Sequence, residues 1–237
     1  VRDMVPAEFT VVFPEWLRGP FGVALYVHGY EGMLADLLAD PDFAHAVMGR
    51  VVHERQAWFE ARARYLGQPV PPATILDDEV DAGVIGPHHY RDFILPYEKT
   101  IAEFHQRIVY WHSCGSTGPM AGDILSIGQV DLLDVSGWTD LEQVLSIISQ
   151  GEASNGATDQ RVEIRFKSVK DLHEASPERI ETQLRKTLSI CRRYDVSALC
   201  LRADAIQPWD NLEADVKKVK QWIDIARRVV SENEASG

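Results

Sequence analysis

A histidine and a cysteine separated by one residue, His112 and Cys114, have the types and spacing that suit metal binding. They follow the β-branched run 107–111, so we expect them at the end of a strand. Side chains two residues apart on extended backbone point to the same side, where an imidazole nitrogen and a thiolate can hold one zinc ion. The spacing alone leaves open a packed histidine beside an inert cysteine.

The segment after Cys114 predicts a reactive thiol. Gly115 turns the backbone, and a helix is expected to start near Gly118. Backbone amides at a helix start favour a thiolate, so Cys114 should ionise more readily than the other two cysteines. Those are Cys191, in a helical pattern, and Cys200, within a predicted strand.

Three carboxylates, Asp77, Asp78 and Glu79, end a second β-branched run, 73–76. Neighbouring carboxylates repel one another unless a cation, an arginine or a shared proton relieves the repulsion, which favours a functional role. Strand alternation makes Asp78 face away from Asp77 and Glu79, so at most two of the three can point into one site. The alternative is a cluster that caps the following helix.

Parallel strands are the elements expected to position these side chains. Short β-branched runs alternate with longer helical patterns, which is typical of βα units, and helical spacing predicts one long helix over 43–65. Reactive side chains in such folds gather at the carboxyl ends of the strands, so we predict one domain over 1–237 with its site there. The six predicted strands cover residues 9–13, 73–76, 107–111, 130–134, 162–166 and 198–202.

Composition narrows the class of partner. The 237 residues are 45% hydrophobic and carry a formal net charge of -12. This charge repels phosphate backbones and anionic membrane surfaces, so we expect a small-molecule substrate and neither nucleic acid nor a membrane. Three scattered cysteines and the lack of a long apolar run in the sequence argue against a disulfide framework or a signal segment, which predicts a cytoplasmic protein.

Several motifs together resemble the uroporphyrinogen decarboxylase superfamily in residue type, order and spacing. The resemblance implies an α/β fold of the (β/α)8 TIM-barrel type, with about six of the eight βα units in this chain. The two N-terminal units are then expected to be missing, and a second copy in a homodimer is one way to supply them. The motifs are Gly19-Pro20-Phe21, Leu76-Asp77-Asp78, residues 86–96, His112-Ser113-Cys114-Gly115, and residues 176–180 and 206–213.

Within that superfamily, His112-Ser113-Cys114-Gly115 is similar to the zinc- and corrinoid-linked methyltransferases. That branch implies a zinc ion that activates a thiol, a corrinoid or tetrahydrofolate as methyl carrier, and a corrinoid protein as partner. The arginine-rich N-terminal motif and the C-terminal histidine motif of the decarboxylases are absent from the sequence. The resemblance therefore favours methyl transfer over decarboxylation.

The resemblance also implies roles for single residues. The metal ligands are His112, Cys114 and a third residue at the end of the last strand, where alignment on residues 208–213 puts Asp204. Cys200 is the alternative third ligand, although it lies four residues earlier and so about 13 Å deeper along a strand. Asp78 is expected to be the catalytic carboxylate at the mouth of the barrel.

Five further residues are expected to bind substrate: Asp77, Glu79, His88, Lys167 and Trp138. Lys167 belongs to Arg165-Phe166-Lys167-Ser168, which stands where the family usually has Gly-Gly-Ile-Asp and would change the charge of the mouth. Trp138 follows a strand and could stack on a planar ligand, and His88 lies in a helix-start loop within reach of the mouth.

The leading hypothesis is an enzyme that transfers a methyl group with a metal-activated site. One alternative is a decarboxylase-like lyase that places cations and carboxylates around an acidic substrate without a metal. A second alternative is a binding or scaffold barrel that has lost its metal site. The metal content of the purified protein distinguishes the first hypothesis from the other two.

Overall fold

The computed structural model describes residues 4, 6, 8, 12–128, 130–150, 160–196, 199–204 and 208–234. Within these ranges the strands form one parallel sheet in the order β1-β2-β3-β4-β5, so neighbours in the sheet are also neighbours along the chain. Such an order is that of successive βα units in a barrel wall. The strands are β1 Ala73–Leu76, β2 Ile108–His112, β3 Leu132–Val135, β4 Arg161–Phe166 and β5 Leu199–Ala203.

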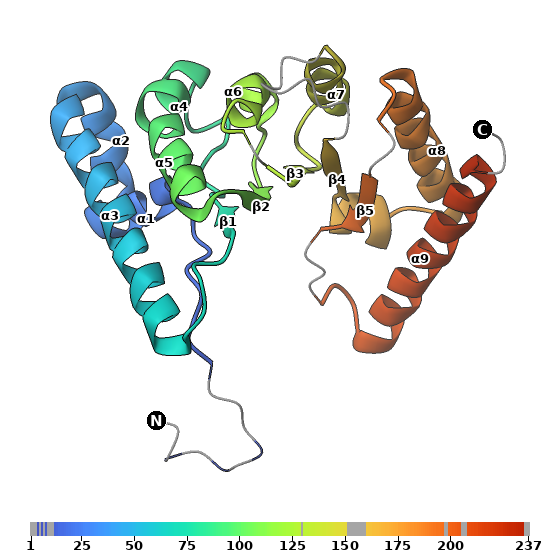
Figure 1. Ribbon diagram of the computed structural model, residues 1–237. Helices are drawn as coiled ribbons and strands as arrows, with labels where there is room; N and C mark the ends of the chain where they lie inside the picture. The colour runs from blue at the N-terminus through green and yellow to red at the C-terminus, as the bar shows by residue number, and fades with distance from the viewer. Residues whose placement is uncertain are drawn as a thin grey trace.

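Helices stand around the sheet as an open arc that runs from α3 at one end to α9 at the other (Figure 1). This α/β arrangement is a partial barrel, and five of the six predicted strands are confirmed with bounds that differ by at most two residues. The helices are α1 Pro20–His28, α2 Tyr30–Ala39, α3 Pro41–Leu66, α4 Pro87–Phe93, α5 Leu95–His105, α6 Ala121–Leu125, α7 Leu141–Ser149, α8 Pro177–Arg193 and α9 Leu212–Glu234, with a 3-10 turn at Gly118–Met120 and a π-helical turn at Ser168–His173.

Local sequence explains the bounds of the long helix α3. The side chain of Asp40 accepts a hydrogen bond from the backbone N–H of Phe43, and Pro41 occupies the first turn, where no donor is needed. Gly67 ends the helix with φ 62°, a left-handed conformation that favours glycine. The predicted helix over 43–65 is therefore confirmed.

The strand predicted over 9–13 is not found at the residues that the structure describes. Residues 9–11 lie outside the described residues, and Val12 and Phe13 are not in a strand. Pro14 follows them and has no N–H to donate to a ladder, while the ring of Phe13 packs 5.1 Å from that of Trp58 on α3. The contact with the free edge of β1 is made further along, where Arg18 forms a single parallel bridge to Leu76.

A buried arginine fixes that bridge. Arg55 of α3 is 1% exposed and donates from Nη1 to the carbonyl oxygen of Arg18 and from Nη2 to that of Thr74, both at 3.0 Å. Burial lowers the pKa of Arg55 to about 10, which leaves it charged at neutral pH. The long helix therefore ties the Arg18 segment to β1.

The two faces of the sheet differ in chemistry. Residues such as Ile75, Trp111 and Ile164 belong to the apolar core beneath the helices. Strand alternation turns their neighbours to the opposite face, which carries the polar side chains Tyr110, His112, Asp134, Glu163 and Arg165. Across the described ranges, each helix is too short or too polar to span a bilayer.

One carboxylate is buried on the helix side. Glu98 of α5 is 0% exposed, accepts a hydrogen bond from the Tyr90 hydroxyl at 2.5 Å, and accepts another from Nε1 of Trp111 at 3.1 Å. Burial raises the pKa of Glu98 from its ordinary 4.5 to about 7. The folded protein therefore holds a proton that the unfolded chain releases between these two pH values.

The stability of the protein should fall as pH rises from 5 to 8, and Glu98→Gln should remove part of that fall. Below pH 4.5 Glu98 is protonated in both states and costs nothing, whereas above pH 7 its ionised form is buried. Such a shift corresponds to on the order of 3 kcal/mol. Urea unfolding at both pH values measures it, with exposed Glu103→Gln on the same helix as control. Equal pH dependence in wild type and Glu98→Gln would contradict this assignment.

Candidate metal centre

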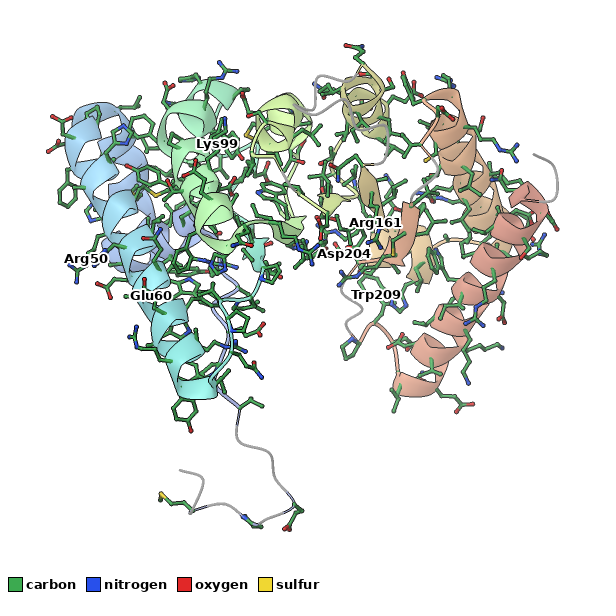
Figure 2. The ribbon with its side chains drawn as sticks, viewed as in Figure 1. Arg50, Glu60, Lys99, Arg161, Asp204 and Trp209 are labelled. Carbon is green, nitrogen blue, oxygen red and sulfur yellow. The ribbon has the colours of Figure 1, made fainter. Side chains whose placement is uncertain are left out.

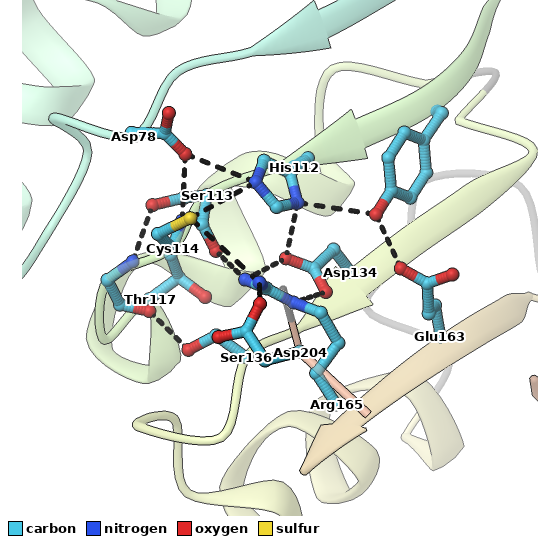
Figure 3. A network of polar contacts seen from close by, with 12 residues as sticks. Asp78, His112, Ser113, Cys114, Thr117, Asp134, Ser136, Glu163, Arg165 and Asp204 are labelled. Carbon is cyan, nitrogen blue, oxygen red and sulfur yellow. Dashed lines mark hydrogen bonds and ion pairs between the residues drawn. The ribbon is translucent and has the colours of Figure 1, made fainter. Parts of the chain in front are cut away.

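The carboxyl ends of β1 and β2 bring three metal-ligand side chains together (Figure 3). Leu76 pairs with His112 in the sheet register, so Asp78 and Cys114 both lie two residues past the same level. Nε2 of His112 lies 3.1 Å from Oδ1 of Asp78 and 3.4 Å from Sγ of Cys114. One donor atom from each residue lies within 4.8 Å of the other two.

The donor set fits zinc. Carboxylate oxygen, imidazole nitrogen and thiolate sulfur are all zinc ligands, and two ligands of one tetrahedral zinc lie about 3.3 to 3.8 Å apart. The distances from His112 to Asp78 and Cys114 are close to that range. Among the described residues, this is the one group of three such side chains. The sequence predicted His112 and Cys114 as metal ligands and Asp78 as a catalytic carboxylate, and the structure places Asp78 beside the other two.

A tight turn positions Cys114. Ser113 is buried and donates from Oγ to the carbonyl oxygen of Val80 at 2.8 Å, while its Oγ accepts from the N–H of Gly115 at 3.0 Å. A Cβ at Gly115 would lie 2.4 Å from Cβ of Asp81, so only glycine fits there. The N–H of Cys114 donates to Oδ1 of Asp78 at 3.2 Å, which holds the thiol next to the carboxylate.

Polar contacts on the other side of the ring orient His112. Its Nδ1 lies 3.0 Å from Oδ2 of Asp134 and 3.2 Å from the hydroxyl of Tyr110, which donates to Glu163 at 2.5 Å. Nε2 therefore points at Asp78 and Cys114, as a carboxylate-supported metal ligand does. Burial lowers the pKa of His112, but Asp134 and Asp78 more than offset this and raise it to about 9.

The thiol does not have the environment expected from the sequence. The helical segment after Cys114 begins with the 3-10 turn at Gly118–Met120, and the described contacts of Sγ are with Nε2 of His112 and Nη1 of Arg165, not with N–H groups of that turn. Burial, followed by the nearby carboxylate of Asp78, raises the pKa of Cys114 to about 11. Without a cation Cys114 is therefore a thiol at neutral pH, which corrects the expectation that a helix start favours its thiolate.

The proposed third ligand Asp204 meets an arginine. Oδ1 of Asp204 accepts from Nη1 of Arg165 at 2.6 Å, and the same Nη1 lies 3.9 Å from Sγ of Cys114. Asp204 lies inside the arc of helices, whereas Arg50 lies on the outer surface of α3 (Figure 2). The guanidinium of Arg165 separates Asp204 from Cys114. Asp78 stands in the group of three where the sequence suggested Asp204.

Cys200, the alternative third ligand, lies too deep along β5. It pairs in register with Glu163, and its Sγ lies 3.9 Å from Oε2 of Glu163. Arg202, two residues further along, donates to the same carboxylate at 3.1 Å. The structure therefore brings Cys200 to Glu163 and not to the His112 and Cys114 pair.

Asp77 and Glu79 have structural partners. Asp77 is 0% exposed and accepts hydrogen bonds from the N–H groups of Phe21 at 3.0 Å and Gly22 at 2.7 Å, which caps the start of α1. Glu79 forms an ion pair with Arg18, which also donates to Asp78 at 2.8 Å. The expectation that Asp77 binds substrate is corrected, because a buried cap is out of reach of a ligand.

The structure pairs two of the expected substrate residues. Nζ of Lys167, after β4, lies 3.4 Å from the ring centroid of Trp138, after β3, and Trp138 is 63% exposed. His88 is in the first turn of α4, where its ring packs 3.8 Å from that of His89. None of the polar contacts described for the ligand group involves His88. The N–H of Trp138 donates to Oγ of Ser136 at 3.2 Å, and that Oγ donates to the carbonyl oxygen of Gly115, next to Cys114.

Two functional side chains were missed by the sequence reasoning. Asp134 supports His112, and Arg165 binds Asp134 through Nε at 2.7 Å and Nη2 at 2.9 Å. A charged residue within a strand is the signal that could have found them, because such a charge needs a partner when it is buried. In 161–166 the charged residues between apolar ones are Glu163 and Arg165, and in 132–135 the charged residue is Asp134.

The parallel strands form a barrel wall, and polar side chains lie at their carboxyl ends. These features define the class of α/β-barrel proteins, in which enzymes have their active sites at that end. Residues 16–162, more than half of the chain, match the family described as "Uroporphyrinogen decarboxylase (URO-D)". The chain belongs to the uroporphyrinogen decarboxylase family. This result confirms the resemblance at the level of the superfamily.

A solved structure shares the fold. The structure is similar to a methyltransferase from Methanosarcina mazei with a TM-score of 0.59 and 15% sequence identity. The match covers 87% of this chain and 57% of that chain, so this chain corresponds to a little over half of the methyltransferase. No curated protein matches the sequence.

Adjacent carboxylates should give opposite results when replaced. Asp77→Ala removes the acceptor of two backbone N–H groups and should lower the free energy of unfolding by about 1 to 3 kcal/mol. Asp78→Asn breaks a partly exposed ion pair, so its cost should be about 1 kcal/mol or less, but it should weaken zinc binding at least about tenfold. Urea unfolding and competition with a chromophoric chelator measure the two effects. The two roles would be reversed if folded Asp77→Ala bound zinc more weakly than wild type, or if Asp78→Asn bound zinc as tightly as wild type.

Proposed function

We propose that this protein is a methyltransferase-like enzyme that holds a zinc ion at the mouth of its barrel. The observation that carries the proposal is the group formed by Asp78, His112 and Cys114, whose donor atoms lie within 4.8 Å of one another. The similarity of His112-Ser113-Cys114-Gly115 to the zinc-linked branch supports it. The fold shared with the methyltransferase from Methanosarcina mazei supports it as well.

Each side chain has a role in this proposal. Asp78, His112 and Cys114 bind the ion, and Asp134 holds the imidazole so that Nε2 faces it. Arg18 binds the second oxygen of Asp78 and keeps that carboxylate turned into the site. When bound, zinc supplies a Lewis acid that stabilises a substrate thiolate or polarises a leaving oxygen.

Lys167 and Trp138 are proposed to bind the substrate next to the ion. The ammonium of Lys167 offers a charge to an anionic group, and the exposed indole of Trp138 offers a flat apolar surface. The methyl carrier is proposed to be a corrinoid, delivered by a corrinoid protein, or tetrahydrofolate. A thiolate ligand needs reducing surroundings, which agrees with a cytoplasmic location.

A metal-free lyase is the second candidate, and the charge of His112 favours it. Burial lowers the pKa of His112, but Asp134 and Asp78 raise it to about 9, so the metal-free imidazole carries a proton at neutral pH that it could donate to a substrate. In that reaction Cys114 would have no part as a nucleophile, because burial and Asp78 raise its pKa to about 11. The metal content of the protein separates the two candidates.

The purified protein should contain about one zinc per chain, and His112→Ala should lower the zinc affinity at least about tenfold. The reason is that His112 lies between the other two donors, within 3.4 Å of both. Elemental analysis after dialysis against a weak chelator measures the zinc content. His53→Ala, on the exposed face of α3, is the matched control. Zinc retained by His112→Ala, or absent from wild type and not taken up on addition, would leave the lyase as the better candidate.

Zinc should protect Cys114 from alkylation. In the metal-free protein its rate of modification should rise with pH toward 11, because only the thiolate reacts and its pKa is about 11. Added zinc should slow modification at least about tenfold and release protons as the ligands deprotonate. Peptide mass spectrometry follows Cys114, with exposed Cys200 as internal control. An unchanged rate at Cys114 with zinc would remove it from the ligand set.

A further inference from the structure

Every N–H of Arg165 has a partner within the site. A guanidinium has five N–H donors. Those of Arg165 reach both oxygens of Asp134, the carbonyl oxygen of Ser113 at 2.7 Å, Oδ1 of Asp204 at 2.6 Å and Sγ of Cys114 at 3.9 Å. The side chain is 1% exposed. It therefore has no donor left for a substrate, and its role must be exerted through the groups that it holds.

Those groups include two carboxylates next to the ligand group. The side chain of Asp134 is 0% exposed and that of Asp204 is 27% exposed. Asp204 would be attracted to a divalent ion at His112 and Cys114, since carboxylate oxygen is an accepted zinc ligand, whereas Asp134 is held at Nδ1 on the other side of the His112 ring. The guanidinium gives both a charged partner, and it lies between Sγ of Cys114 and Oδ1 of Asp204.

We propose that Arg165 selects the ligands of the metal centre. It binds Asp204 and so keeps this carboxylate off the ion, which leaves Asp78 as the oxygen ligand beside His112 and Cys114. Asp134 stays at Nδ1 of His112, on the other side of the ring. Arg165 is thus a positioning residue that leaves a coordination position open for substrate. This inference rests on the proposed metal centre.

The planar fork of arginine suits this role. Nε and Nη2 bind one carboxylate side-on while Nη1 points away from it toward a second. Lysine has a single ammonium at the end of a flexible stem and cannot present two parallel donors to Asp134 and a third to Asp204. A lysine at this position should keep the charge and lose the hold on one carboxylate.

Cobalt(II) titration of the purified protein tests the proposal, because its absorption bands report the number and type of ligands. With Arg165 present, Asp204→Asn should leave the cobalt affinity within about twofold and the spectrum unchanged, since Asp204 is not a ligand. Asp131→Asn, which removes a carboxylate paired with Arg107 at 3.4 Å, is the matched control. At least tenfold weaker binding in Asp204→Asn, with Asp131→Asn unchanged, would overturn the proposal.

Arg165→Lys tests whether loss of the guanidinium lets Asp204 bind the ion. This variant should bind cobalt at least threefold more tightly, and its absorption bands should shift because Asp204 becomes a ligand. Adding Asp204→Asn to Arg165→Lys should reverse both changes. An unchanged spectrum in folded Arg165→Lys would overturn the proposal. If circular dichroism finds Arg165→Lys unfolded, the result for Asp204→Asn alone decides.

Failure of the metal centre itself gives a different result. If wild type takes up no cobalt, or if His112→Ala binds it as well as wild type, the proposed function fails and the selection by Arg165 fails with it. If wild type binds cobalt through His112 while Asp204→Asn weakens binding, only the selection fails. The wild type, His112→Ala and Asp204→Asn therefore separate the two hypotheses.

Discussion

The ion pair between Arg165 and Asp134 is the contact on which the site depends. Both side chains are almost fully buried, and an unpaired buried charge costs several kcal/mol, so neither residue can lose the other without loss of stability. Through its remaining donors Arg165 also holds the carbonyl of Ser113 and the carboxylate of Asp204. Arg165 thereby connects the carboxyl ends of four adjacent strands, β2 to β5. These contacts hold the segments that carry His112 and Cys114 in place.

The polar face of the sheet makes this arrangement feasible. Sheets with apolar residues on both faces read as continuous hydrophobic runs, whereas β4 alternates Val162, Ile164 and Phe166 with Glu163 and Arg165. The apolar side chains pack under the helices. The charged side chains form hydrogen bonds and ion pairs with Tyr110 and Asp134, and Asp134 also contacts His112. Polar groups in such a network hold one another in a single geometry because each is costly to leave unpaired, so the orientation of His112 follows from the network.

Sequence patterns predicted what depends on local chemistry. Periodicity gave five strands and the bounds of α3, and a spacing of two residues put the side chains of His112 and Cys114 on one side. The errors concern contacts between distant segments. Asp77 caps α1 although it stands beside Asp78, and Asp204 meets Arg165, 39 residues earlier. The prediction over 9–13 also failed at Val12 and Phe13, where the β-branched run outweighed Pro14 in the prediction although a proline has no N–H to donate to a sheet.

Charge balance supports the proposal of an oxygen ligand from the end of β1 in place of a ligand from β5. A divalent ion held by the carboxylate of Asp78, the thiolate of Cys114 and a neutral His112 would form a centre with no net charge, which costs least in a partly buried place. A further carboxylate would make the centre negative beside Glu79 and Glu163. Arg165 is already paired with both Asp134 and Asp204, and Arg18 is paired with Glu79. The arginines and the proposed ligand set are therefore parts of one electrostatic arrangement, and this arrangement is the reason to expect that a change at residue 165 alters which oxygen would bind the ion.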